Sequence, residues 1–146
     1  MANHYGTLEK ADTYFSERLN TSIWEMSIVS DRTKAMLMAT KAIDRLNYAN
    51  VKTAELQFPR GDDTVVPVEI EYACYEIALA LLDGVDVDQE AQTIGVMSET
   101  YSGVRSTYDG DYVNHHIRAG IPSIIAWDYL KPFLRDPRLL NVSRVN

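Results

Sequence analysis

The chain has 146 residues, of which 46% are hydrophobic and 24% charged, and its formal net charge is −7. This length and composition favour one globular domain with its own core and argue against wholesale disorder. An acidic chain is poorly suited to wrapping nucleic acid, because phosphate binding draws mainly on Lys and Arg. It could still line a pore through which DNA slides.

The only cysteine, Cys74, excludes an intrachain disulfide and is expected to be a packed thiol on a buried helix face. The first residues show no charged segment followed by an apolar run, so we expect no signal peptide. No apolar segment approaches the length that spans a bilayer, and we therefore expect no membrane partner.

A first helix is predicted after Thr7, whose hydroxyl can cap it. Its predicted buried face consists of residues at helical spacing: Leu8, Ala11, Phe15 and Leu19. Trp24 lies in the following connection and is expected to anchor that connection to the core.

A second helix is predicted from Ser30-Asp31, a capping hydroxyl followed by a first-turn carboxylate, to about Leu46. Its predicted inner stripe is Ala35, Met38, Ala39, Ala42, Ile43 and Leu46. The basic side chains of Arg32, Lys41 and Arg45 fall largely outside this stripe and are expected to face solvent.

The helical period disappears between residues 47 and 66, where Phe58-Pro59-Arg60-Gly61-Asp62-Asp63 predicts a turn. A third helix is predicted to begin at Pro67 and stop at Gly84. We expect it to be the spine of the core, with its acidic side chains Glu69, Glu71 and Glu76 on other faces than its buried stripe: Ile70, Ala73, Cys74, Ile77, Ala78, Leu81 and Leu82.

An acidic loop is predicted over residues 86–90, after which the apolar period changes to two. Alternation on both sides of Ser102-Gly103 predicts a β-hairpin over about 93–108. Because its side chains are polar for a buried strand pair, we expect one face to be exposed or paired with a neighbouring chain. The candidate subunit-interface residues are Val96, Tyr101, Val104 and Tyr108.

A loop is predicted over residues 109–120, and Pro122 is predicted to open a fourth helix that ends near Pro132. This helix contains Ile125, Tyr129, Leu130 and Phe133. Residues 136–146 have no amphipathic period and predict an arm that docks onto a partner, through Arg138, Leu139, Leu140, Val142 and Arg144. The predicted fold is mainly α: a bundle of about four helices over residues 1–135, with the inserted hairpin and the extended C-terminal arm.

Catalytic and metal-binding motifs are absent from the sequence: it has no GxSxG, GxxxxGK[ST], GxGxxG or HExxH pattern. His115-His116 is the one place that suggests a metal, but adjacent histidines diverge on most backbones and no cysteine or third histidine is near. A solvated loop or a subunit contact fits this pair better. We predict a protein that is not an enzyme, with no cofactor and no metal, and keep a small enzyme or metal protein centred on His115 and His116 as a remote alternative.

Aromatic side chains could stack on a single strand of nucleic acid, as single-strand-binding proteins commonly do: Tyr48, Phe58, Tyr101, Tyr108, Tyr112 and Trp127. They are not interleaved with a basic patch, so core or interface positions fit them better. A single-stranded-DNA-binding module remains the alternative function.

The order of several short motifs resembles the head–tail connector, or adaptor, proteins of tailed bacteriophages. These motifs are Ala11-Asp12-x-Tyr14-Phe15-x-x-Arg18, Trp24, Ala39-Thr40-x-x-Ile43-Asp44, Gln57-Phe58-Pro59-Arg60, and Val66-Pro67 leading into Ala73-x-x-Glu76-x-Ala78-x-x-Leu81. The similarity extends over Leu8 to Gly84 and continues only in outline beyond it. Some relatives carry the label "putative DnaT-like single-stranded-DNA-binding protein".

The resemblance implies a virion protein of the neck, assembled in the host cytoplasm, that completes the head by forming a ring of about twelve copies beneath the portal protein. Such a ring extends the DNA channel and offers an attachment surface to the next tail or stopper protein. Genomic DNA would pass through its lumen without sequence-specific binding, and the arm at 136–146 would dock into the portal.

Overall fold

The structure is a computed structural model that describes residues 3–89, 92 and 115–135. The prediction of a mainly helical protein is confirmed. The helical elements are α1 (Leu8–Ser16), α2 (Ser22–Met26), α3 (Val29–Asp44), α4 (Val68–Leu82), α7 (His115–Arg118), α8 (Ile124–Leu130) and the short 3₁₀ helix η2 (Lys131–Phe133).

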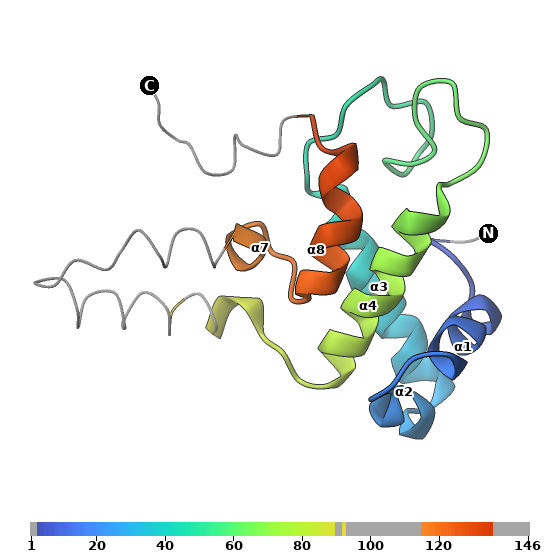
Figure 1. Cartoon of the computed structure of the whole chain (residues 1–146), viewed down its shortest axis with the longest axis vertical. Helices are drawn as coiled ribbons and strands as arrows, with labels where there is room; N and C mark the ends of the chain where they lie inside the picture. The colour runs from blue at the N-terminus through green and yellow to red at the C-terminus, as the bar shows by residue number, and fades with distance from the viewer. Residues whose placement is uncertain (1–2, 90–91, 93–114, 136–146) are drawn as a thin grey trace, which may run out of the picture.

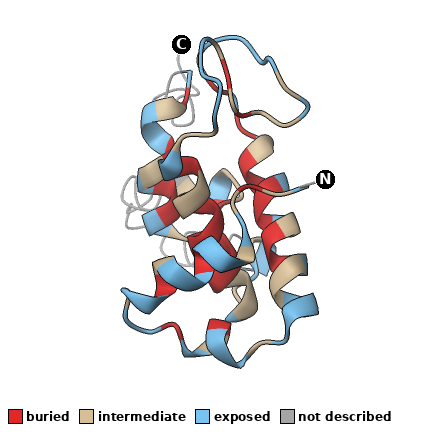
Figure 2. Cartoon of the chain, turned by 90° about the vertical axis from the view of Figure 1, so that its right-hand side faces the viewer, coloured by how far each residue is buried: buried red, intermediate tan, exposed pale blue. Residues whose placement is uncertain are grey.

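Helix α4 is the centre of the molecule, as predicted. It packs against α3, α8, α2 and α1, which lie around it (Figure 1). The buried residues lie on the sides of the helices that face one another (Figure 2). Eight residues of α4 are buried, namely Ile70 and the seven consecutive residues from Ala73 to Leu79.

The prediction that Glu76 lies outside the core is wrong, because its side chain is only 2% exposed. Tyr14 and Arg18, which both donate to its carboxylate, cover it. The helix stops where predicted, with Gly84 at φ +91 in the left-handed region that glycine tolerates. Pro67 is the residue that precedes the first turn rather than its first member.

Helix α1 begins as predicted, with the Thr7 side chain accepting a hydrogen bond from the Lys10 N–H at 3.1 Å. Ala11 and Phe15 are buried, but Leu19 is 83% exposed because the helix already ends at Ser16. Trp24 is 1% exposed and does anchor its connection to the core, within the short helix α2.

Helix α3 starts earlier than predicted. Ile28 is its N-cap residue and makes no side-chain cap, so Ser30 lies inside the first turn. Its buried stripe contains Met36, which is fully buried, whereas Met38 is 54% exposed. The alanine positions of the predicted stripe, Ala35, Ala39 and Ala42, are buried as expected. Of the three basic residues, Lys41 and Arg45 are exposed, but Arg32 is partly buried.

The segment 47–66 has no helix, as predicted, and is held by isolated β-bridges between Lys52 and Arg60 and between Tyr48 and Leu134. These two bridges are the β pairing found in the described part of the chain. The Phe58-Pro59 peptide bond is cis.

The chain after α4 differs from the predicted loops in two places. Residues 87–89 are helical, and the Asp86 carboxylate accepts from the Asp88 N–H at 3.0 Å and the Gln89 N–H at 3.3 Å, as an N-cap does. The predicted loop at 109–120 contains α7. The fourth predicted helix is α8, which Ser123 caps and which ends next to Pro132 in η2.

The predicted hairpin over 93–108, with Val96, Tyr101, Val104 and Tyr108, lies outside the described residues. So do the arm over 136–146 and its candidate docking residues Arg138, Leu139, Leu140, Val142 and Arg144. Within the described residues, no helix combines the length and the apolar character that crossing a bilayer requires.

Candidate functional site

A buried carboxylate on the spine helix joins three segments of the bundle. Glu76 Oε2 accepts a hydrogen bond from Arg18 Nε at 2.7 Å and from the Tyr14 hydroxyl at 2.6 Å. Burial, together with the bond to Glu76, raises the pKa of Tyr14 well above its ordinary value, so the hydroxyl stays protonated and donates. The arrangement satisfies the carboxylate and ties α1, with the turn after it, to α4.

A groove of about 590 Å³ lies beside this cluster, and we call it the Arg18 groove. Its lining includes Arg18, Glu76, Ile23, Met26, Leu79 and Pro122. Arg18 and Glu76 are engaged with each other in an ion pair. Asp83 is the third charged residue of the lining.

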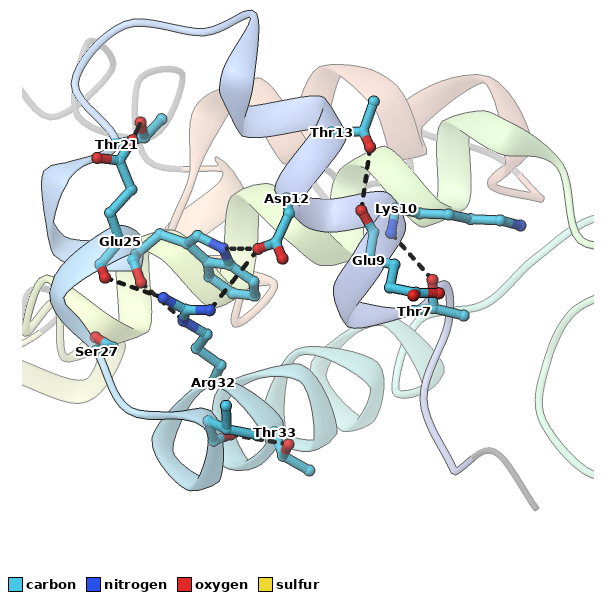
Figure 3. A network of polar contacts seen from close by, with 12 residues as sticks. Thr7, Glu9, Lys10, Asp12, Thr13, Thr21, Glu25, Ser27, Arg32 and Thr33 are labelled. Atoms are coloured by element: carbon cyan, nitrogen blue, oxygen red, sulfur yellow. Dashed lines mark hydrogen bonds and ion pairs between the residues drawn. The ribbon is translucent and has the colours of Figure 1, made fainter.

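A second set of contacts fixes α2 between α1 and α3 (Figure 3). The Asp12 carboxylate accepts from the Trp24 indole N–H at 2.8 Å. Arg32 donates from Nε to the Trp24 carbonyl at 2.9 Å and from Nη2 to the Glu25 carbonyl at 3.0 Å. Its guanidinium carbon also lies 5.3 Å from the centre of the Trp24 ring, within cation–π range. Arg32 thus holds the end of a five-residue helix that is too short to be stable alone.

A third set of contacts organises the nonhelical segment around Arg60, which is only 8% exposed. Its guanidinium donates to the carbonyls of Ala49 at 2.9 Å, Asn50 at 2.6 Å, Tyr48 at 3.3 Å and Gln57 at 3.4 Å. Five N–H donors in a planar fork suit this role, since one side chain satisfies carbonyls from both sides of the segment.

Tyr5 connects the same segment to α3. Its hydroxyl donates to Asp44 and accepts from the Phe58 N–H at 3.2 Å, while its own N–H donates to the Thr40 hydroxyl at 3.0 Å. Burial raises the pKa of the Asp44 carboxyl, and the Tyr5 hydrogen bond opposes that shift. Thr40 in turn lies 3.6 Å from the Cys74 sulfur. Cys74 is fully buried, which confirms the prediction of a packed thiol, and this burial raises the pKa of the thiol to about 12.

These three sets of contacts account for most polar and aromatic positions of the motif order found in the sequence. Asp12, Tyr14, Arg18, Trp24 and Glu76 all make tertiary hydrogen bonds. So do Asp44, Gln57, Phe58 and Arg60. The motif order therefore describes how this bundle is held together.

A second groove, of about 890 Å³, lies between α3, the end of α4 and α7, and we call it the α3 groove. Apolar side chains that line it include Met38, Leu81 and Ile117. Basic side chains in the lining are Lys34, Arg45 and Arg118, and acidic ones are Asp31, Asp86 and Asp88. This groove combines apolar surface with both signs of charge.

Four exposed residues of α3 form a line beside this groove that the sequence analysis missed. They are Lys34, Met38, Lys41 and Arg45, which we call the α3 stripe. Their spacing of i, i+4, i+7 and i+11 could have predicted this line, because such positions share one face of a helix. The prediction that Met38 lies on the inner stripe is wrong, whereas Lys41 and Arg45 face solvent as predicted.

The remaining candidate residues do not assemble into a site. His115 and His116 are the first two residues of α7, and His116 Nδ1 lies 2.8 Å from the Ile121 carbonyl oxygen. Over the described residues no group of three or more His, Cys, Asp or Glu side chains is placed to hold a metal ion. Of the aromatic residues considered for stacking, Tyr48, Phe58 and Trp127 are buried at 2%, 4% and 5% exposure. Tyr101, Tyr108 and Tyr112 lie outside the described residues.

Comparison with known proteins places this architecture in a family. Neither the curated proteins nor the solved structures include a significant match to this chain. A family model described as "Putative DnaT-like ssDNA binding protein" matches residues 1–144, which is nearly the whole chain. The chain therefore belongs to this DnaT-like family.

Proposed function

We propose that this protein is an assembly subunit of the bacteriophage head–tail junction, which joins with copies of itself in a ring beneath the portal. The observation that carries the proposal is that the motif order resembling the head–tail connectors is built into the tertiary contacts of the bundle. A sequence resemblance located in such contacts supports a shared subunit architecture, and the function of a connector subunit is architectural.

An exposed apolar edge supports the same proposal. Leu19, Met26, Ile28 and Val29 are between 61% and 83% exposed and lie together in the chain around α2. We call them the α2 edge. Large apolar side chains gathered in one segment are typical of a surface that another protein covers. In a head-to-tail ring, one such surface on every copy meets a different surface of the next copy, and the ring closes when the rotation permits.

The buried aromatic residues also favour assembly over strand binding. Stacking on bases requires ring faces that a ligand can reach. Tyr48, Phe58 and Trp127 instead pack in the core, where Phe58 meets Tyr48 with ring centres 4.6 Å apart. These rings stabilise the fold and are not available to a single strand.

Electron microscopy of portal particles mixed with the protein tests the proposal. We expect a ring of added density at the outer end of the portal. The arm is tested by deleting residues 136–146: the truncated protein should fold, as judged by its helical circular dichroism, and lose attachment to the portal. A full-length protein that leaves portal particles bare would contradict the proposal.

A second candidate is a single-stranded-DNA-binding module, and the description of the matched family favours it. Arginine and lysine side chains in the α3 stripe offer the charge that such binding requires. Salt-dependent binding of an oligonucleotide at low micromolar concentration, by a protein that ignores portal particles, would make this the primary function. Absence of binding at low salt would remove it.

A further inference from the structure

The α3 stripe is a narrow line of positive charge on an acidic protein. With 3.6 residues per turn, Lys34, Met38, Lys41 and Arg45 fall within about 60° of one another around the helix axis. At 1.5 Å per residue the line extends over roughly 16 Å along the helix. All four residues are exposed. The formal net charge of the chain is −7, so the local charge of the stripe is opposite in sign to the net charge of the molecule.

The three basic side chains of the stripe take no part in the tertiary contacts described above. Arg18, Arg32 and Arg60 make the tertiary contacts described above, and Lys10 and Lys131 lie 3.8 Å and 3.7 Å from the carboxylates of Glu71 and Asp128. In the described part of the chain, Lys34, Lys41 and Arg45 have no ion pair with a carboxylate. Their positive charge is therefore available to an external anion.

The surroundings of the stripe favour an extended anion over a single small one. Lys34, Met38 and Arg45 line the α3 groove, and Arg118 of α7 lies on the same groove. The acidic residues in its lining are Asp31, one turn before Lys34, and Asp86 and Asp88 just beyond the end of α4. The basic side chains are spaced along the helix and do not converge on one point. Such a line of charges, with apolar surface between them, suits a chain of phosphates that carries apolar groups.

We infer that the α3 stripe is the surface of this protein that contacts the phosphate backbone of DNA. The inference rests on the DNA contact that both candidate functions include: in a connector ring the stripe would face the DNA of the channel, and in a binding module it would hold the strand. It names the residues that make that contact, which neither the family description nor the motif order identifies. Lys34, Lys41 and Arg45 contact phosphates, and Met38 supplies apolar contact beside them.

Fluorescence anisotropy of the full-length protein tests the inference, with a labelled oligothymidylate and a labelled duplex of equal length as probes. The stripe variant is K34Q/K41Q/R45Q, and the matched control is K10Q/K52Q/K131Q, whose sites are exposed and lie outside α3. Both variants lower the formal net charge by the same three units. Thermal unfolding of each establishes that it is folded.

We expect the stripe variant to bind the preferred probe at least about tenfold more weakly at low salt, and the control variant to stay within about twofold of wild type. Removing three phosphate contacts should also reduce the slope of log K against log salt by about 2 for a single strand. A tighter complex with the duplex points to the channel of a connector, and a tighter complex with the oligothymidylate points to a binding module.

Three results would overturn the inference: equal weakening in both variants, no weakening in the stripe variant, or no binding of either probe by wild type. Photo-crosslinking gives an independent readout if the stripe variant is unstable, because wild-type protein should crosslink to the probe through an α3 peptide. The electron-microscopy experiment with portal particles uses no added oligonucleotide. Its outcome therefore tests the proposed connector function separately from DNA binding by the α3 stripe.

Discussion

Arg18 and Glu76 lie 58 residues apart in the chain, and Arg18 Nε donates to Glu76 Oε2 at 2.7 Å in a cluster that also contains Tyr14. The carboxylate is 2% exposed and the arginine side chain 27%, so the pair is partly shielded from water. Each charge compensates the other for its removal from water. This ion pair fixes the position of α1 and of the turn toward the α2 edge.

The Arg18→Met variant should be destabilised by about 3 kcal/mol, because it leaves a buried carboxylate with only the Tyr14 hydroxyl. Adding Glu76→Gln should recover part of that loss, since the unpaired charge is then removed. Urea unfolding of the two single variants and the double variant measures the coupling. The pair of Lys10 and Glu71, at 3.8 Å and with the lysine side chain 63% exposed, is the control, and Lys10→Met should cost less than about 1 kcal/mol. Additive losses in the double variant would show that the pair does not act as a unit.

Gly6 is predicted to be intolerant of any side chain. Its φ of +70 lies in the left-handed region, and a Cβ there would lie 2.3 Å from the Tyr75 hydroxyl oxygen. Gly6→Ala should cost about 3 kcal/mol, from backbone strain and overpacking together. Gly84 has φ +91 with nothing within 4 Å of its Cβ position, so Gly84→Ala should cost only about 1 kcal/mol.

Tyr75→Phe supplies the internal check on that explanation. In the Gly6→Ala background it removes the nearest clashing atom and should restore part of the melting temperature. Ring carbons at 2.6 and 2.7 Å remain, so the rescue should be incomplete. A melting temperature of Gly6→Ala equal to that of Gly84→Ala would contradict the proposed contact with Tyr75.

Asp44 should make the stability depend on pH with a defined sign. Its pKa is raised above 3.8 in the folded state by burial, so the folded protein holds this proton more tightly than the unfolded chain. The resulting stabilisation is fully present below the unfolded pKa and is lost as pH rises through the folded pKa. Asp44→Asn cannot titrate, and it keeps an oxygen that can accept from Tyr5.

The free energy of unfolding of wild type minus that of Asp44→Asn should therefore fall as pH rises from below 3.8 through the raised pKa of Asp44. Urea titrations of both proteins over this range measure the difference directly, and contributions from other carboxyls largely cancel. A difference that grows with pH would mean that the Tyr5 hydrogen bond outweighs burial and that the folded pKa is depressed.

Arg60 is predicted to control the local stability of the nonhelical segment. An Arg60→Lys variant keeps the charge but replaces a planar fork with a single ammonium, which cannot reach carbonyls on both sides. We expect a loss of about 2 kcal/mol. Hydrogen exchange should quicken at residues 47–60 and remain slow in the centre of α4. Uniform acceleration across both regions would indicate that Arg60 supports the whole fold and not one segment.

The strongly periodic parts of the fold could be predicted from the sequence. In α4, Ile70, Ala73 and Cys74 share a face with Ile77 and Ala78, and every one of them is buried. Thr7 and Gly84 mark helix ends through local geometry, which needs no tertiary information. The same reasoning explains why 47–66 could be predicted to be nonhelical.

Burial that depends on a distant segment could not be predicted in this way. Glu76 is buried because Arg18 and Tyr14 cover it, and periodicity within α4 contains no information about either. In α3 the alanines allow more than one inner face, and residues two apart point in opposite directions on a helix. The choice of Met36 over Met38 is then decided by packing against α4.

The candidate surfaces were predictable only in part. The α3 stripe follows from spacing alone once the helix is known, because Lys34, Lys41 and Arg45 share a face. That its basic side chains make no ion pair within the described residues could not be predicted, because this depends on where the carboxylates of other elements lie. The α2 edge was hidden because Leu19 was assigned to a helix that ends three residues earlier, at Ser16.

The central claim is that this chain acts by assembling at the portal, and its most direct test is cryo-electron microscopy of purified portal particles incubated with the full-length protein. The proposed function predicts a closed ring of copies at the outer end of each portal, with the bundle of α3, α4 and α8 recognisable in every copy. Portal particles that stay bare, while the same protein binds single-stranded DNA as a free monomer, would contradict it.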